Sequence, residues 1–83
     1  MTYDETKRQI NLTTHAIDLA LCSCVFDAPM VTKEDDRYSY GEQRLVSLCW
    51  FNNRVAVMVW TDRDPVPHVI SCRYGDKSQQ PAT

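Results

Sequence analysis

Two apolar runs separated by only two asparagines dominate the second half of this 83-residue sequence. Residues 42–51 and 54–60 are rich in β-branched and aromatic side chains, which favours strands. Asn52 and Asn53 tolerate the positive φ angles that a two-residue type I′ turn requires. The sequence therefore predicts an antiparallel hairpin with these two asparagines at its turn.

The register of this hairpin assigns its side chains to two faces. If Phe51 pairs with Arg54, alternation along each strand fixes which residues share a face. One face then carries Arg44, Val46, Leu48, Trp50, Val55, Val57, Val59 and Thr61, and the other carries Leu45, Ser47, Cys49, Ala56, Met58 and Trp60. The second strand is apolar on both faces, so we expect it in the middle of the sheet.

Two helices are predicted before the hairpin. Asp4 provides an N-cap for a polar helix over residues 5–14, and Asp18 provides one for a second helix with an apolar stripe. Pro29 ends the second helix, because the residue before a proline is pushed toward extended geometry.

Short strands over residues 30–34 and 66–73 complete the predicted elements, with a polar loop over 35–41. The order predicts an α+β domain: two N-terminal helices packed on a three- to four-stranded antiparallel sheet, with no C-terminal helix. We expect residues 1–74 to form a single domain. Residues 75–83 have nothing worth burying and are expected to form a flexible tail.

Composition limits the function further. The net charge of −2 excludes a globally basic surface, but arginine outnumbers lysine six to three, so a local phosphate-binding patch stays open. No two of the four cysteines form a C-x2-C pair, and neither His15 nor His68 has ligand-like spacing to any of them. We therefore expect buried free thiols, no metal site and no cofactor. Without a signal peptide or a membrane-spanning run, a cytoplasmic location is expected.

Five landmarks, in order along the chain, resemble those of the BrnT family of ribonuclease toxins. They are YDETKRQINL at 3–12 with His15, VFD at 25–27 with Pro29, YGEQR at 40–44, WTDR at 60–63, and VISCR at 69–73. The resemblance implies a RelE-like fold and a type II toxin–antitoxin module. It also implies that the chain cleaves RNA and slows translation, and that a BrnA-type antitoxin masks it.

The chain departs from the family pattern at three points. The family's Lys-His-Gly becomes Thr14-His15-Ala16, and the sequence that starts its basic C-terminal helix becomes Arg73-Tyr74-Gly75-Asp76. The overall charge is acidic.

Candidate site residues follow from the resemblance and from the chemistry of RNA cleavage. The RNA 2′-hydroxyl attacks the neighbouring phosphate if the protein moves protons and stabilises negative charge, and this needs no metal. Arg44 and Arg73 match family positions suited to charge stabilisation, although both also fit solvated arginines at the sheet rim. His15 is either a general acid or base or a structural residue at the helix end.

Three further residues complete the candidate set. Glu42 is either a base or a support for Arg44, since it projects from the same strand face. Arg63, in a turn, and Lys7, on the polar helix, either contact RNA or remain solvated.

These features leave two main functions open. The first is a BrnT-like, metal-independent endoribonuclease that is held inactive by an antitoxin. The alternative is a catalytically inactive, toxin-derived binding module that dimerises or binds an antitoxin-like partner, because the sheet exposes apolar residues that need cover. A nucleic-acid-binding regulator fits less well with the acidic charge.

Overall fold

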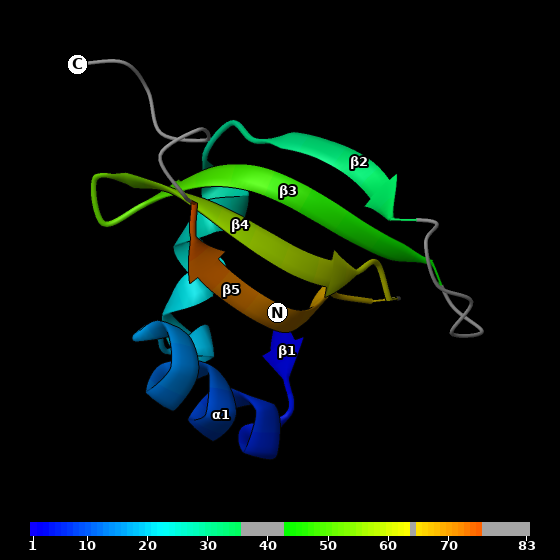
Figure 1. The fold of residues 1–83 in the computed structure, drawn as a ribbon. Coiled ribbons are helices and arrows are strands. Elements are labelled where there is room, and N and C mark those ends of the chain that lie inside the picture. The colour runs from blue at the N-terminus through cyan, green and yellow to red at the C-terminus, as the bar shows by residue number, and fades with distance from the viewer. Residues whose placement is uncertain (36–42, 64, 76–83) are drawn as a thin grey trace.

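The computed structural model describes residues 1–35, 43–63 and 65–75. In chain order the elements are β1 (Thr2–Tyr3), α1 (Glu5–His15), the 3-10 helix η1 (Leu19–Asp27), β2 (Val31–Asp35), β3 (Arg44–Phe51), β4 (Arg54–Thr61) and β5 (His68–Tyr74). The strands form one sheet in the order β1-β5-β4-β3-β2 (Figure 1).

The prediction of two helices on a three- to four-stranded antiparallel sheet is wrong, because the described residues form a mixed sheet of five strands. β1 pairs in parallel with β5 through Thr2↔His68 and Tyr3↔Val69, whereas the other pairings are antiparallel. A two-residue strand has no periodicity that a sequence pattern can reveal. Its hydrogen-bonding partner also lies 66 residues away, at the start of the last strand.

The central hairpin is confirmed. Phe51 pairs with Arg54, and Asn52 and Asn53 have φ angles of 52° and 60°, as a type I′ turn requires. β4 lies in the middle of the sheet, between β3 and β5. A register irregularity between Val59 and Trp60 lets β5 accommodate one extra residue.

Both predicted helix N-caps are confirmed, but the second helix has different geometry. The carboxylate of Asp4 accepts a hydrogen bond from the backbone N–H of Lys7, and that of Asp18 accepts one from Ala20. The segment after Asp18 winds as a 3-10 helix, in which the N–H of Leu21 donates to the carbonyl of Asp18. A length of nine residues is unusual for a 3-10 helix.

The core lies between the helices and one face of the sheet. It comprises Ile17, Leu19, Cys22, Val25, Cys49, Ala56, Met58, Val69 and Cys72. Three of its members are cysteines, which are free thiols as predicted. Hydrogen bonds with the Cys22 and Cys49 thiols, together with burial, raise the pKa of Cys72 well above its usual range.

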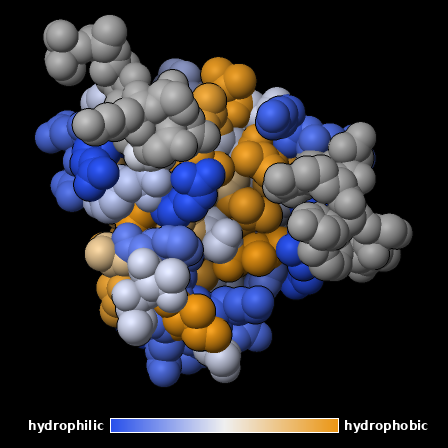
Figure 2. All heavy atoms as spheres, in the orientation of Figure 1, coloured by the Kyte–Doolittle hydropathy of each residue, from blue (hydrophilic) through white to orange (hydrophobic). Residues whose placement is uncertain are grey.

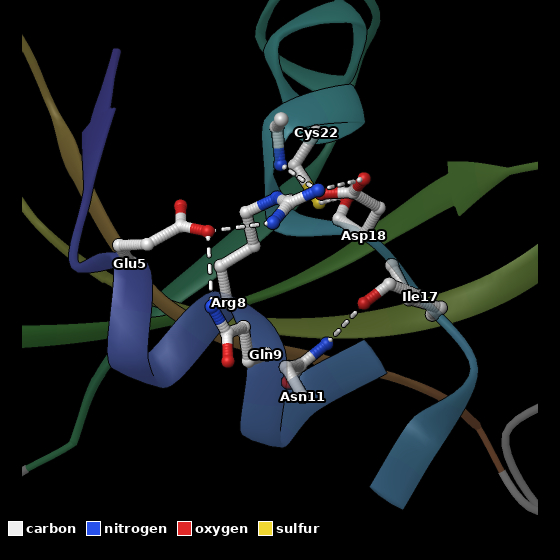
Figure 3. A network of polar contacts seen from close by, with 8 residues as sticks. Glu5, Arg8, Gln9, Asn11, Ile17, Asp18 and Cys22 are labelled. Carbon is white, nitrogen blue, oxygen red and sulfur yellow. Dashed lines mark hydrogen bonds and ion pairs between the residues drawn. The ribbon is translucent and has the colours of Figure 1, made fainter. Parts of the chain in front are cut away.

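A polar network joins the two helices (Figure 3). The guanidinium of Arg8 donates from Nε to Asp18 Oδ1 at 2.8 Å and from Nη2 to Asp18 Oδ2 at 3.1 Å, and it also bonds Glu5 at 2.7 Å. These hydrogen bonds lower the pKa of Asp18. Arg8 therefore holds α1 against the start of η1.

The opposite face of the sheet, which we call the open face, is not covered by α1 or η1. Three of its side chains are conspicuously exposed: Val31 at 72%, Trp50 at 50% and Leu48 at 40%. A groove of about 320 Å³ lies among Pro29, Met30, Val31, Leu48, Cys49, Trp50 and Val55. Figure 2 shows apolar side chains gathered over the strands on the side turned to the viewer.

The predicted C-terminal tail begins with an ordered residue. Gly75 is buried, and its N–H donates to the carbonyl of Val55 at 2.9 Å. Residues 76–83, where the predicted tail continues and where a C-terminal helix would lie, are outside the described residues. Residues 36–41 of the predicted loop over 35–41 are outside them as well, whereas Asp35 ends β2.

Candidate functional site

Three polar residues form a row across adjacent strands at one end of the sheet. At this end of the sheet, β3 begins, β4 ends and β5 begins (Figure 1). Thr61 pairs with His68, and Leu45 pairs with Trp60, so Arg44 comes next to Thr61. We call Arg44, Thr61 and His68 the polar row.

The polar row lies on the open face. Trp60 lies on the helix-covered face, where its ring contacts Phe26 at 5.1 Å between centroids and its Nε1 donates to Ser47 at 2.8 Å. Successive side chains of a strand alternate between faces, so Thr61 and its row neighbours point to the other side. Neighbouring strands are about 4.8 Å apart, so the backbones of Arg44 and His68 are separated by about 10 Å.

Hydrogen bonds hold the backbone of the polar row in place. The hydroxyl of Thr61, which is only 2% exposed, donates to the carbonyl of Gln43 at 2.7 Å and ties the end of β4 to the start of β3. On the other side, Thr2 Oγ1 lies 2.7 Å from His68 Nδ1, and the N–H of Thr2 donates to the carbonyl of Pro67. The imidazole is therefore oriented by the N-terminal strand.

Arg63 lies at the same end of the sheet, two residues beyond the end of β4, and it is exposed. Arg44 is half-buried at the start of β3. The structure thus brings two of the predicted arginines, Arg44 and Arg63, to one region. It adds His68, which the sequence suggested only as an unsuitable metal ligand.

Arg73 lies at the opposite end of the sheet from Arg44, although both are on the open face. Arg73 pairs with Val57, which pairs with Leu48, and Leu48 is four residues along β3 from Arg44. At about 3.3 Å per residue this is an offset of about 13 Å along the strands, in addition to two strand spacings. The backbones of the two arginines are therefore well separated, both along and across the strands.

His15 ends α1 on the hairpin side of the molecule, and it is half-buried. Its helix neighbours Leu12 and Ala16 line a groove of about 570 Å³ together with Trp50, Asn52, Tyr74 and others. The same end carries Arg54, whose guanidinium lies 3.9 Å from the centre of the Tyr74 ring. His15 therefore lies toward the end of the sheet that carries Arg73, and not toward the end that carries Arg44.

Two predicted site residues remain, Lys7 and Glu42. Lys7 is exposed on the first turns of α1, and Glu42 is outside the described residues. Among residues 1–35, 43–63 and 65–75, no group of three or more His, Cys, Asp and Glu side chains is placed to hold a metal ion. Neither helix in these ranges combines the length and apolarity needed to cross a bilayer.

A family model described as "Ribonuclease toxin, BrnT, of type II toxin-antitoxin system" matches residues 3–79, which is nearly the whole chain. The chain belongs to this family of toxins, and membership implies an antitoxin partner. A search of curated proteins found no match.

Proposed function

We propose that this chain is a metal-independent endoribonuclease that inhibits translation by cleaving RNA in the cytoplasm. The observation that supports this proposal is that Arg44 and Arg63 lie at the same end of the sheet, in a chain of the BrnT family. Guanidinium groups bind phosphate oxygens in a bidentate way and stay charged at all physiological pH values. Two of them together would stabilise the extra negative charge that develops on a phosphate under attack.

The RNA supplies its own nucleophile, so the reaction needs no metal-bound water. The 2′-oxygen forms a bond to the adjacent phosphorus, and the bond from phosphorus to the 5′-oxygen breaks. The products are a 2′,3′-cyclic phosphate and a 5′-hydroxyl. The protein's task is to position the phosphate, stabilise its charge and move two protons.

The test is cleavage of a single-stranded RNA by the purified chain in buffer containing EDTA. We expect cleavage by the wild type, and a loss of about 100-fold or more in Arg44→Ala, since this is the size of effect that follows removal of a charge-stabilising donor. Arg63→Ala removes an exposed guanidinium at the same end of the sheet and tests the second arginine of the proposed site. Arg54→Ala is the matched control, because it removes the same charge at the hairpin end.

Two results would contradict the proposal. Cleavage that requires added Mg²⁺ would remove the metal-independent mechanism. No cleavage at all, with no growth arrest or fall in protein synthesis on expression, would favour the inactive binding module instead.

The partner we propose is a BrnA-type antitoxin that covers the exposed apolar residues Val31, Leu48 and Trp50. Exposed apolar groups of this kind favour association, because covering them removes apolar surface from water. We expect Trp50 fluorescence to shift to the blue when the antitoxin binds. Sedimentation of the toxin alone would show whether a homodimer covers the same residues in the partner's absence.

A further inference from the structure

Resting on the proposed ribonuclease function, we propose that His68, and not His15, is the general base of RNA cleavage. His68 shares the open face and the sheet end with Arg44, one strand beyond Thr61 in the polar row. A base must lie within hydrogen-bonding reach of the proton that it removes, in a plausible pose of the substrate. Only His68, of the two histidines, lies at the end of the sheet where the arginines gather.

The spacing within the polar row suits one nucleotide linkage. The backbones of Arg44 and His68 are about 10 Å apart, and both side chains rise from the same face. Arginine is long enough to reach a phosphate held between them, while the imidazole meets the ribose attached to that phosphate. Thr61 lies between them with its hydroxyl engaged by Gln43, so the middle of the row is fixed.

The imidazole of His68 is also held in a defined orientation. Thr2 Oγ1 contacts Nδ1 at 2.7 Å, so Nε2 is the ring atom directed away from β1. For Nε2 to accept a proton, Nδ1 must carry the ring proton and donate it to Thr2 Oγ1, and the proposal assigns this tautomer to His68. Thr2 is thus a positioning residue, which acts through His68.

His68 takes one proton in the reaction, and water supplies the other. Neutral Nε2 of His68 takes the proton of the 2′-hydroxyl while the 2′-oxygen forms its bond to phosphorus. The bond to the 5′-oxygen breaks, and that oxygen takes a proton from water. The imidazolium then returns its proton to solvent, and Arg44 neutralises the phosphate charge throughout.

His15 is poorly placed for the same role. It ends α1 beside the groove lined by Leu12 and Ala16, on the hairpin side. Trp50, which lines the same groove, is six residues along β3 from Arg44, or about 20 Å at about 3.3 Å per residue. A substrate phosphate at Arg44 would therefore be out of reach of its imidazole.

The experiment measures single-turnover cleavage of one RNA by the full chain and by three variants between pH 5 and pH 8.5. For His68→Gln we expect a loss of about 100-fold or more, the usual contribution of general acid–base catalysis. His15→Gln should stay within about threefold of the wild type. Thr2→Val should lower the rate and move the acid side of the pH profile, whereas a purely structural role would leave the shape of the profile unchanged.

A second measurement distinguishes the loss of a base from misfolding of the variant. Free imidazole in the buffer should restore part of the activity of His68→Ala, which only a lost base explains. If His68→Gln cleaves at the wild-type rate, or His15→Gln alone loses activity, this inference is overturned while the ribonuclease proposal stands. A wild type that does not cleave RNA would overturn both.

Discussion

Asn11 completes the outer edge of β5 by hydrogen-bonding both backbone groups of Cys72. Its Nδ2 donates to the carbonyl of Cys72 at 2.8 Å, and its Oδ1 accepts from the N–H of Cys72 at 3.0 Å. β1 pairs with β5 only at His68 and Val69, so the amide of Asn11 takes the place of a further strand residue. Nδ2 also donates to the carbonyl of Ile17, which fixes the turn after α1.

Asn11→Ala should therefore be strongly destabilising. Asn11 is 4% exposed, and its loss leaves the backbone groups of Cys72 without these partners in the core. Buried unpaired groups cost about 1–3 kcal/mol each, so we expect the free energy of unfolding to fall by about 2–4 kcal/mol. Urea unfolding measures it. Gln9→Ala, on the exposed side of the same helix, should change stability very little, and an equal loss there would contradict this explanation.

Acid should weaken the contact between α1 and η1 through Asp18. Hydrogen bonds from Arg8 lower the pKa of Asp18 below its usual 3.8 in the folded state. Its contribution to stability is therefore fully present above the unfolded pKa and is lost as the pH falls through the folded pKa. Urea unfolding between pH 7 and pH 2.5 should show a smaller acid-dependent loss in Asp18→Asn than in the wild type. Glu5→Gln should change the profile less, because Glu5 is the more exposed partner of Arg8.

Ala16→Gly should stabilise the protein. Ala16 follows α1 with φ 60° and ψ 27°, in the left-handed region that costs a residue with a Cβ about 1–2 kcal/mol. Glycine removes this strain but adds entropy to the unfolded chain, so the net gain should be about 0.5–1 kcal/mol. Thermal unfolding gives the difference. Ala28→Gly is the control, because Ala28 is extended at φ −120° and should gain nothing.

Thiol labelling should separate Cys24 from the other cysteines. Cys24 is exposed, whereas Cys22, Cys49 and Cys72 are buried. A maleimide under native conditions should modify one site, which peptide mass spectrometry identifies as Cys24, and urea should release the other three. Rapid native labelling of Cys72 would contradict the buried cluster of thiols.

Substitution of the two tryptophans should change the free energy of unfolding by different amounts. Trp60 donates to Ser47 and makes an edge-on contact with Phe26, so Trp60→Phe should cost about 1–3 kcal/mol. Trp50 is half exposed on the open face, and Trp50→Phe should be nearly neutral. Chemical denaturation measures both. A larger effect at Trp50 would mean that the open face is covered within the monomer.

Much of the local structure was predictable because its signals are short-range. The Asn-Asn turn, the register that it sets and the two aspartate N-caps all depend on residues close together in the sequence. β1 was not predictable from the same evidence, because its two residues are defined only by a partner in the last strand. The 3-10 geometry of η1 was missed because an apolar stripe fits either kind of helix over so few residues.

The candidate site was harder to predict for a topological reason. The sequence suggests a joint role for Arg44 and Arg73 because each lies near a strand end. However, β3 and β5 run in the same direction on either side of β4. The start of one strand and the end of the other therefore lie at opposite ends of the sheet. The same topology brings the start of β5, and with it His68, next to the start of β3. Strand order, which single residues do not encode, decides which side chains meet.

The pairing of β1 with β5 has a consequence for how the protein is made. β1 pairs with residues 68 and 69, so this pairing cannot form until nearly the whole described domain has been synthesised. A nascent chain that stops before this point lacks the proposed imidazole base and leaves Thr2 with nothing to orient. Under the proposed mechanism, the oriented imidazole would therefore be assembled only after synthesis of the last strand.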